Sequence, residues 1–398
     1  MFSNNDMISS RQIKRLLIFD LFGISSLLLP AQLAGTGGGM GIWCILAGTG
    51  LAFFYLWMLQ ICLGRAVQDY LEYLSQGFGT FLAKLFYVCY GLICITAGAY
   101  TAKLLSELMC ESLLDSREFP VALLIVLLLA LYGGIAGLEA RARVYEILFW
   151  VLVIPLLVML ALCVRQVQAI QWFPIAGHMG EEAAMGFWSG AWRCFMAFLP
   201  LTFLLFLVPN VKDKKKTSYA AVCALTVSGL ALFIIYLILL GIFGSRALMQ
   251  EQYPIITLMG MVKIPGEFIK RLDALMVGVW FFTLYAMIGS SLYYGVSILR
   301  RAFAKSAAEK NAAQKNEPYK KSCYFAAAAA VYGIAYGFYL LPETEHLAGR
   351  LFAYIGVPFL MLVPMLSLFL CRGKAHNKGS RVRTNETDHD ERKGVDEC

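Results

Sequence analysis

Residues that loosen a membrane helix stand together near the start of the chain, in the stretch FGISSLLLPAQLAG. In hydrocarbon each unpaired backbone group is costly, so an interrupted helix is expected only where its free groups line a cavity or meet a ligand. The N-terminus of a half-helix favours a carboxylate, and freed carbonyls favour a cation. This stretch is therefore predicted to bind a zwitterion such as an amino acid through Gly23, Ile24, Ser25 and Ser26. The alternative is that glycine and serine only let helices pack closely.

A second interruption is predicted in the middle of the chain, in FMAFLPLTF, where Pro200 follows Phe198 and Leu199. Interrupted segments at matching positions of two halves indicate an inverted repeat with its binding site near the membrane midplane. These three residues are predicted to line the wall opposite the first interruption. The alternative is a proline that only kinks its helix, which membrane helices tolerate.

Hydroxyl groups supply further candidates for ligand contact. Ser290 and Tyr294 are four residues apart, on one face of a helix, and are predicted to orient a small ligand. Thr96 is a polar residue at a suitable depth in another predicted helix. The alternative for the serine is a hydroxyl that bonds back to its own helix, and the alternative for Thr96 is packing.

Two charged residues, Asp20 and Arg193, are candidate gate residues, since charges within membrane segments are functional candidates by default. Lys14 and Arg15 lie close to Asp20 in the sequence, so pairing at the membrane surface and a role in proton coupling both stay open. Arg193 has the alternative of snorkelling to the surface. Asp20 is expected to lie too far toward the cytoplasm to reach the ligand, which favours a neutral or zwitterionic ligand over a polyamine.

Composition places these residues in a polytopic membrane protein. Of the 398 residues, 59% are hydrophobic and 15% are charged, against about 25% charged in typical soluble domains. The eleven cysteines form no CxxC pair and lie mostly in apolar segments, which is typical of buried thiols. The predicted helices contain no histidine, so neither a metal site, nor a cofactor, nor an enzyme active site is expected.

The elements that position the candidates are ten apolar segments, each long enough to be a spanning helix. They are residues 13–35, 39–63, 80–108, 119–137, 145–164, 184–209, 218–243, 272–298, 322–341 and 348–371. The predicted fold is an all-α membrane domain, residues 1–371, with one repeat in 13–164 and a second in 184–371. Residues 372–398 are predicted to be a disordered, charged cytoplasmic tail. The excess of Lys and Arg in alternate loops places both termini in the cytoplasm.

Three stretches resemble one family, the spore germination permeases, which are multispanning subunits of germinant receptors. They are FGISSLLLPAQLAG, then GLEARARVYEILF with Gly137, Glu139 and Arg143, and FLVPNVKDKKK after the sixth predicted helix. The motifs occur in the order and spacing of that family over most of the chain. The family belongs to the amino acid–polyamine–organocation transporter superfamily, which implies a five-plus-five inverted fold with discontinuous first and sixth helices.

The resemblance implies a permease-like subunit that binds a small germinant, often an amino acid, beside a larger membrane subunit and a lipoprotein subunit in the inner spore membrane. Glu139 and Arg143 are interpreted as a structural pair. In sodium-coupled relatives of this fold a serine pair on the eighth helix helps bind Na⁺, so Ser290 and Ser291 are a candidate sodium site. Coupling to Na⁺ or H⁺ stays open. The alternative function is a secondary amino-acid transporter of the same fold in the cell membrane.

Overall fold

The structure is a computed structural model that describes residues 8–66, 69–111, 118–168, 172, 181–211, 213–261, 272–304 and 317–371. Helices make up nearly all of this part of the chain, and its extended pairing is one isolated bridge between Ile8 and Val211. The predicted tail, residues 372–398, lies outside the described residues.

The first half of the chain forms five long helices and one short one. They are α1 (Ser10–Gly37), α2 (Gly41–Arg65), α3 (Tyr70–Phe78), α4 (Thr80–Met109), α5 (Phe119–Ile135) and α6 (Leu138–Cys163). Gly137, which precedes α6, has a φ of 93°, a conformation that favours glycine. The glycine of the GLEARAR motif therefore makes the turn between α5 and α6. Arg143 donates to the Glu139 carboxylate one helical turn away, so the two residues of the motif form an ion pair.

The second half has more interruptions. Its elements are α7 (Glu181–Ala197), the 3₁₀ helix η5 (Leu199–Asn210), α8 (Lys214–Gln250), α9 (Pro254–Met261), α10 (Leu272–Phe303), α12 (Glu317–Leu340), α13 (Pro342–Leu351), the π-helical turn η6 (Phe352–Gly356) and α14 (Val357–Leu370). Helix α8 bends at Gly244, which has a φ of 69°. The predicted end of this segment, residue 243, lies next to the bend.

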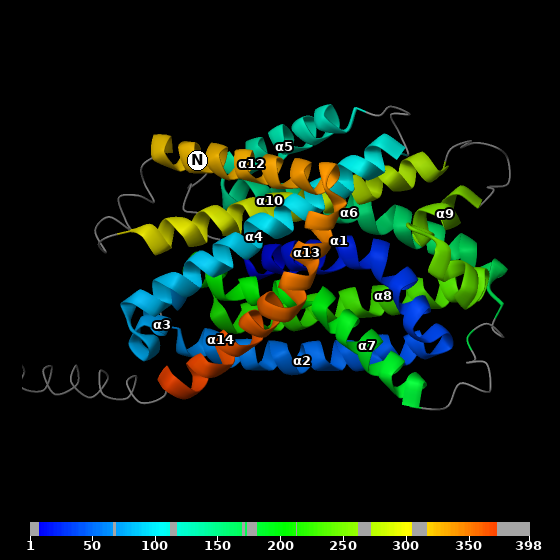
Figure 1. Ribbon diagram of the computed structural model, residues 1–398, viewed down its shortest axis with the longest axis horizontal. Helices are drawn as coiled ribbons and strands as arrows, with labels where there is room; N and C mark the ends of the chain where they lie inside the picture. The colour runs from blue at the N-terminus through cyan, green and yellow to red at the C-terminus, as the bar shows by residue number, and fades with distance from the viewer. Residues whose placement is uncertain are drawn as a thin grey trace, which may run out of the picture.

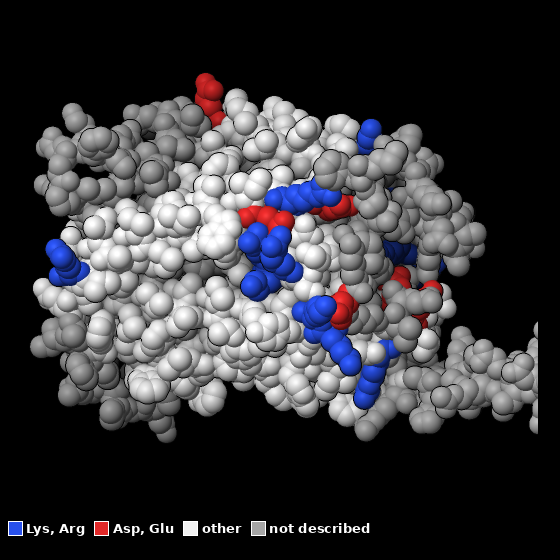
Figure 2. All heavy atoms as spheres, turned by 180° about the vertical axis from the view of Figure 1, so that it is seen from behind, with Lys and Arg blue, Asp and Glu red and all other residues white. Residues whose placement is uncertain are grey.

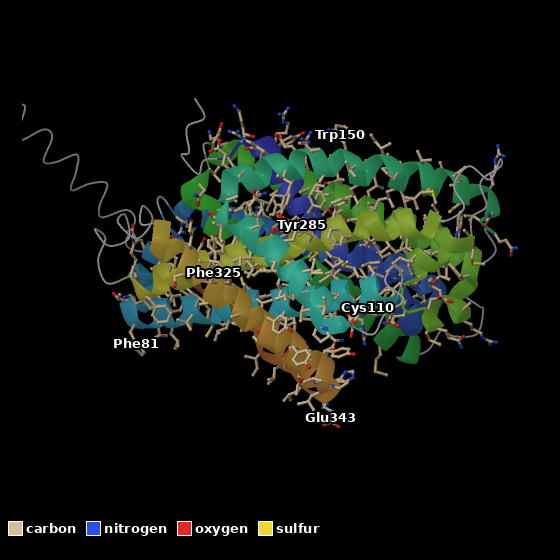
Figure 3. All side chains as sticks on the ribbon, turned by 90° about the horizontal axis from the view of Figure 1, so that it is seen from above. Phe81, Cys110, Trp150, Tyr285, Phe325 and Glu343 are labelled. Atoms are coloured by element: carbon tan, nitrogen blue, oxygen red, sulfur yellow. The ribbon has the colours of Figure 1, made fainter. Side chains whose placement is uncertain are left out.

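Each predicted span overlaps a helical segment of the structure. Within the described residues, nine helices are long and apolar enough to cross a membrane, and α5, at 17 residues, is slightly shorter. Large hydrophobic side chains cover the outside of the bundle: Phe81 is 80% exposed and Trp150 is 53% exposed, and both point away from the ribbon in Figure 3. Figure 2 shows a face that is uncharged over most of its described surface. The chain is a multi-pass integral membrane protein.

Helices of the first half pack against helices of the second half. Helix α1 packs along α8 and α2 packs along α7, while α4 packs along α10. If α1, α2 and α4 correspond to α7, α8 and α10, the contact of α1 with α8 corresponds to that of α7 with α2, and the contact of α4 with α10 corresponds to itself. Helices α13 and α14 cross the front of the bundle at an angle (Figure 1). The pairing agrees with two repeats, whose limits at 13–164 and 184–371 remain a prediction.

The crossing of α2 and α7 depends on Gly48. A Cβ atom at Gly48 would lie 2.6 Å from the carbonyl oxygen of Ala191 and 2.6 Å from Cβ of Cys194. Both are atoms that no rotamer change can move. Two residues further along α2, a Cβ at Gly50 would meet nothing within 4 Å. Small residues at such crossings let membrane helices approach closely, and this crossing fixes the position of the segment that follows α7.

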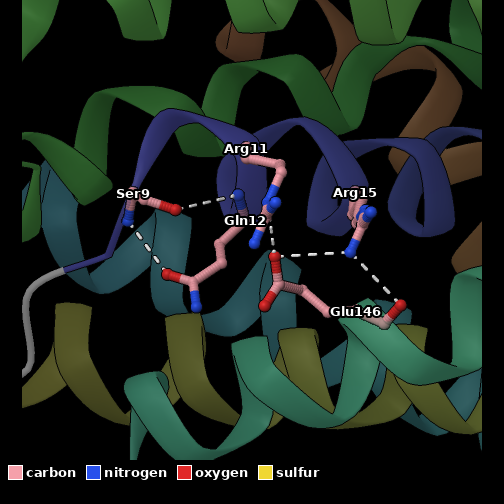
Figure 4. A network of polar contacts seen from close by, with 5 residues as sticks. All are labelled: Ser9, Arg11, Gln12, Arg15 and Glu146. Atoms are coloured by element: carbon pink, nitrogen blue, oxygen red, sulfur yellow. Dashed lines mark hydrogen bonds and ion pairs between the residues drawn. The ribbon is translucent and has the colours of Figure 1, made fainter.

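Polar contacts hold the first turn of α1 (Figure 4). The Gln12 backbone N–H donates to Ser9 Oγ at 3.4 Å and the Ser9 N–H donates to Gln12 Oε1 at 2.9 Å, which is a capping box. Glu146 of α6 pairs with Arg11 at 2.9 Å and with Arg15 at 3.3 Å. The start of α1 is thereby tied to α6.

A second ion-pair cluster ties α13 to α4. Lys103 Nζ lies 2.9 Å from Glu107 of its own helix and 2.8 Å from Glu345 of α13. The Lys103 side chain is only 12% exposed. Because the pairs are shielded from water, they hold α13 more firmly than exposed pairs would.

Candidate functional site

A cavity of about 340 Å³ lies between α1, α4, α7, η5 and α10. Phe352 of η6 and Leu360 of α14 complete its wall. Most lining side chains are apolar, and two among them, Asp20 and Arg193, carry a charge. Its volume is at the lower end of the range of roughly 300–1,000 Å³ for small-molecule sites. The cavity therefore suits a small ligand with both polar and apolar parts.

Helix α1 presents one face to the cavity. The lining residues recur at helical spacing, with Asp20, Ile24, Leu28 and Gln32 in one row and Leu21, Ser25 and Leu29 in the next. From Asp20 to Gln32 this face extends about 18 Å along the helix axis. The position of Asp20 differs from the prediction. Asp20 lines the cavity, because it lies one helical turn before Ile24 and therefore on the same face of α1.

The structure also differs from the predicted interruption of the first helix. Helix α1 continues through Gly23 and Pro30. The hydroxyl of Ser25 bonds to the carbonyls of Leu21 and Phe22, and that of Ser26 donates to the carbonyl of Gly23 at 2.9 Å. Serine hydroxyls that bond back in this way satisfy their own helix, so the glycine and serines do not open it.

The second interruption is present where it is predicted. Helix α7 ends at Ala197, and Phe198 leaves the helical region with a φ of −98° and a ψ of 2°. The chain continues as the 3₁₀ helix η5, a form that is uncommon in runs this long and that often marks a functional hinge. Leu199 and Pro200 line the cavity at the break, and Phe198 is fully buried behind them.

Buried hydrogen bonds fix η5 in place. The Tyr55 hydroxyl of α2 lies 2.6 Å from Thr202 Oγ1 and donates to the carbonyl of Leu360 at 2.9 Å. The single hydrogen of the Thr202 hydroxyl is donated either to Tyr55 Oη or to the carbonyl of Leu199, which lies 2.8 Å away. One tyrosine therefore connects η5 to α2 and to α14, and this network holds the wall of the cavity.

Helix α10 contributes the hydroxyl-rich wall. Ser290, Ser291 and Tyr294 all line the cavity, at the spacing of one helix face. The ring of Tyr294 stacks on Phe203 of η5, with ring centroids 5.2 Å apart. A Cβ at Gly98 of α4 would lie 3.0 Å from Cβ of Ser291, so α4 and α10 approach closely there.

Some predicted residues lie outside the cavity. A Cβ at Gly23 would overlap Met287 Sδ, so this glycine faces α10. Ser26 is buried and accepts a hydrogen bond from Trp280 Nε1 at 3.0 Å. Thr96 is half-buried and neighbours Ala97, which does line the cavity. Of the predicted ligand-binding set, Ile24, Ser25, Leu199, Pro200, Ser290 and Tyr294 are brought together around one space.

Helix α4 supplies lining residues that sequence reasoning missed, namely Ile93, Ala97, Tyr100 and Thr101. They share one face of α4, but this face carries no glycine, proline or charge to distinguish it from ordinary packing. Their role follows only from the packing of α4 against α10.

Arg141 is a further residue of the site that the sequence pattern does not single out. It is 4% exposed, and its Nη1 donates to the carbonyl of Gly289. The guanidinium lies over the ring of Tyr293, 4.8 Å from the centroid, and within electrostatic range of the Asp20 carboxyl. The predicted span begins at residue 145, whereas α6 begins at Leu138, so the predicted helix leaves Arg141 out.

Comparison with known proteins identifies relatives of this chain. The model of a family described as "Spore germination protein" matches residues 7–316. Spore germination protein B2 of Bacillus subtilis (strain 168) is 26% identical over 286 residues, which cover 68% of this chain and 73% of that protein. Spore germination protein GerLB of Bacillus cereus is 24% identical over 391 residues, which cover 95% of this chain and 98% of that protein.

Solved structures with the same fold are transporters. A substrate-bound, outward-open Na⁺-coupled sialic acid symporter aligns with a TM-score of 0.65 and 13% identity over 90% of this chain and 79% of that chain. A nucleobase-cation-symport-1 family transporter, closed around bromovinylhydantoin, aligns with a TM-score of 0.61 and 13% identity over 83% of this chain and 72% of that chain. These similarities establish the fold.

Proposed function

Because the chain belongs to the spore germination protein family, we propose that it is the permease-like membrane subunit of a spore germinant receptor. In this proposal a small germinant binds in the cavity between α1, α4, η5 and α10, and its binding triggers germination. The chain is a membrane protein of the receptor or transporter type, with a transporter fold.

The observation that carries the proposal is the cavity at the interrupted helix. It combines an apolar wall with Asp20, Arg193 and several hydroxyls, which is the mixture that a small polar molecule with an apolar side chain requires. Both a negative and a positive side chain face the same space, which favours a zwitterion. We therefore propose an amino acid as the ligand.

The family also suggests where the protein acts and with what. We propose that it resides in the inner spore membrane with both termini in the cytoplasm, beside a larger membrane subunit and a lipoprotein subunit. Membership of the spore germination protein family supports this arrangement. Co-purification of the tagged chain from spore membranes, with identification of the retained proteins, tests the partners.

The second candidate function is a secondary amino-acid transporter, and the fold shared with a Na⁺-coupled symporter favours it. In that case Ser290 and Ser291, which both line the cavity, would offer hydroxyls to a coupling Na⁺, and Asp20 is the candidate for coupling to H⁺.

One reconstitution separates the two functions. The purified protein in liposomes is tested with radiolabelled amino acids for saturable binding and for counterflow uptake, with and without Na⁺. Saturable binding without uptake supports the receptor subunit, and uptake supports the transporter. Neither binding nor uptake of any amino acid, together with normal germination of spores that lack the gene, contradicts the proposed function.

A further inference from the structure

Three polar side chains at the Asp20 end of the cavity each have a buried oxygen atom that makes no well-formed hydrogen bond in the described part of the chain, although Ser290 interacts with the Asp20 carboxyl. They are Asp20, through Oδ1, and Ser290 and Tyr294, through their hydroxyls. Their residues are 6%, 3% and 2% exposed. Buried polar groups in proteins are nearly always hydrogen-bonded, so three that share one space require a common explanation.

The unpartnered groups are not a general property of the cavity wall. The hydroxyl of Ser25 bonds back to α1, and that of Thr101 donates to the carbonyl of Ala97 at 2.8 Å. Both residues line the same cavity. Among the described residues that line the cavity, the fully buried side-chain oxygens without a hydrogen bond are therefore those of Asp20, Ser290 and Tyr294.

The chemistry of the three groups defines what would satisfy them. An ionised carboxylate only accepts hydrogen bonds, and the serine and tyrosine hydroxyls can accept as well. A primary ammonium group carries one positive charge and three N–H donors, one for each of these oxygens. Hydrogen bonds from a charged donor to a carboxylate are among the strongest in proteins.

Arg141 favours the ionised form of the buried Asp20 carboxyl. Its guanidinium lies within electrostatic range of the Asp20 carboxyl. Two other contacts hold the guanidinium in place: Nη1 donates to the carbonyl of Gly289, and the guanidinium lies over the ring of Tyr293. Nε and Nη2 have no hydrogen-bond partner among the described side chains and backbone. The arginine thus offsets part of the charge of Asp20, and Oδ1 keeps an unused capacity to accept a hydrogen bond.

We propose that Asp20, Ser290 and Tyr294 form a binding site for a primary ammonium group at one end of the cavity. The ligand class is a protonated primary amine whose remaining atoms extend along the apolar face of α1. This inference rests on the proposed function, because it identifies which part of an amino-acid germinant this end of the cavity holds.

The test uses propylammonium chloride as the probe and the purified full-length protein in nanodiscs. The melting temperature of the protein is measured against probe concentration, with NaCl and tetramethylammonium chloride at equal ionic strength as controls. We expect a saturable increase with propylammonium alone, because tetramethylammonium has no N–H donor. Asp20→Asn is expected to weaken the binding of propylammonium by about ten- to a hundred-fold, because one charge-assisted hydrogen bond is lost.

Two further variants keep the test independent of any folding defect in Asp20→Asn. Ser290→Ala and Tyr294→Phe each remove one hydroxyl and leave the charge unchanged. Both are expected to weaken the binding of propylammonium. Ser228→Ala is the matched control, since Ser228 of α8 also has a fully buried hydroxyl without a partner among the described residues but lies away from the cavity.

Several results would overturn the ammonium site. They are the absence of any propylammonium effect on the wild-type protein, an equal effect of tetramethylammonium or Na⁺, and unchanged affinity in all three cavity variants. The proposed function is judged separately, by amino-acid binding and by germination. A protein that binds amino acids normally after all three substitutions would keep the proposed function and lose the ammonium site.

Discussion

Replacement of Gly48 by alanine should destabilise the protein by disturbing the packing of α2 on α7, and the same replacement at Gly50 serves as its control. The added Cβ would lie 2.6 Å from a backbone oxygen of α7 and 2.6 Å from a Cβ of the same helix. An ordinary contact would need 3.4 Å or more, so the helices must separate. The same substitution at Gly50 meets nothing within 4 Å.

The difference between the two variants isolates the cost of the overlap. Both replace a glycine inside α2, so both gain the same helix propensity, about 0.8–1.0 kcal/mol relative to glycine. Overpacking costs about 1–3 kcal/mol when backbone has to move. Gly48→Ala should therefore be about 1–3 kcal/mol less stable than Gly50→Ala, and Gly50→Ala should be at least as stable as the wild type.

The free energy of unfolding can be compared by reversible titration with SDS in mixed micelles, followed by tryptophan fluorescence. Equal unfolding midpoints for the two alanine variants would refute the reasoning, because the close crossing of α2 and α7 would then be absent. A reduced midpoint for Gly50→Ala would refute it as well, since that position would then be packed.

Three other substitutions test single contacts by the same unfolding assay. Trp280→Phe removes the indole donor to Ser26 and should cost about 0.5–1.5 kcal/mol; no change would mean that this buried bond is absent. Tyr55→Phe removes the hydroxyl that joins η5 to α2 and α14 and should cost about 1–3 kcal/mol, because a buried carbonyl loses its donor. Arg15→Ala should destabilise more than Arg11→Ala, since the Arg15 side chain is 13% exposed and that of Arg11 is 71% exposed; the reverse order would contradict the packing of α1 on α6.

The sequence predicts the helices well because a segment that crosses the hydrocarbon core must be long and apolar. It predicts the second interruption because Pro200 disrupts helical hydrogen bonding at that point. It fails at the first interruption for a local reason. Ser25 and Ser26 bond to the carbonyls of their own helix, and residue type alone does not tell whether a serine satisfies its helix or a ligand.

The charged residues of the site were harder to place, because their role depends on helix rotation and helix limits. Asp20 shares a face with Ile24, and this spacing could have placed it in the cavity. Arg141 lies one turn before the predicted start of its helix. The lining residues of α4, such as Ala97 and Thr101, follow from the packing of α4 on α10, which a single sequence does not contain.

The central claim, that a small germinant binds in this cavity, is tested most directly by filling it. Ala97 lines the cavity, and Leu92 of the same helix points outward with 56% exposure. Spores whose only copy of the gene carries Ala97→Phe or Leu92→Phe are compared for germination with amino acids, after both variants are found at wild-type levels in the spore membrane. The account predicts loss of the response with Ala97→Phe and a normal response with Leu92→Phe. A normal response with Ala97→Phe would contradict it.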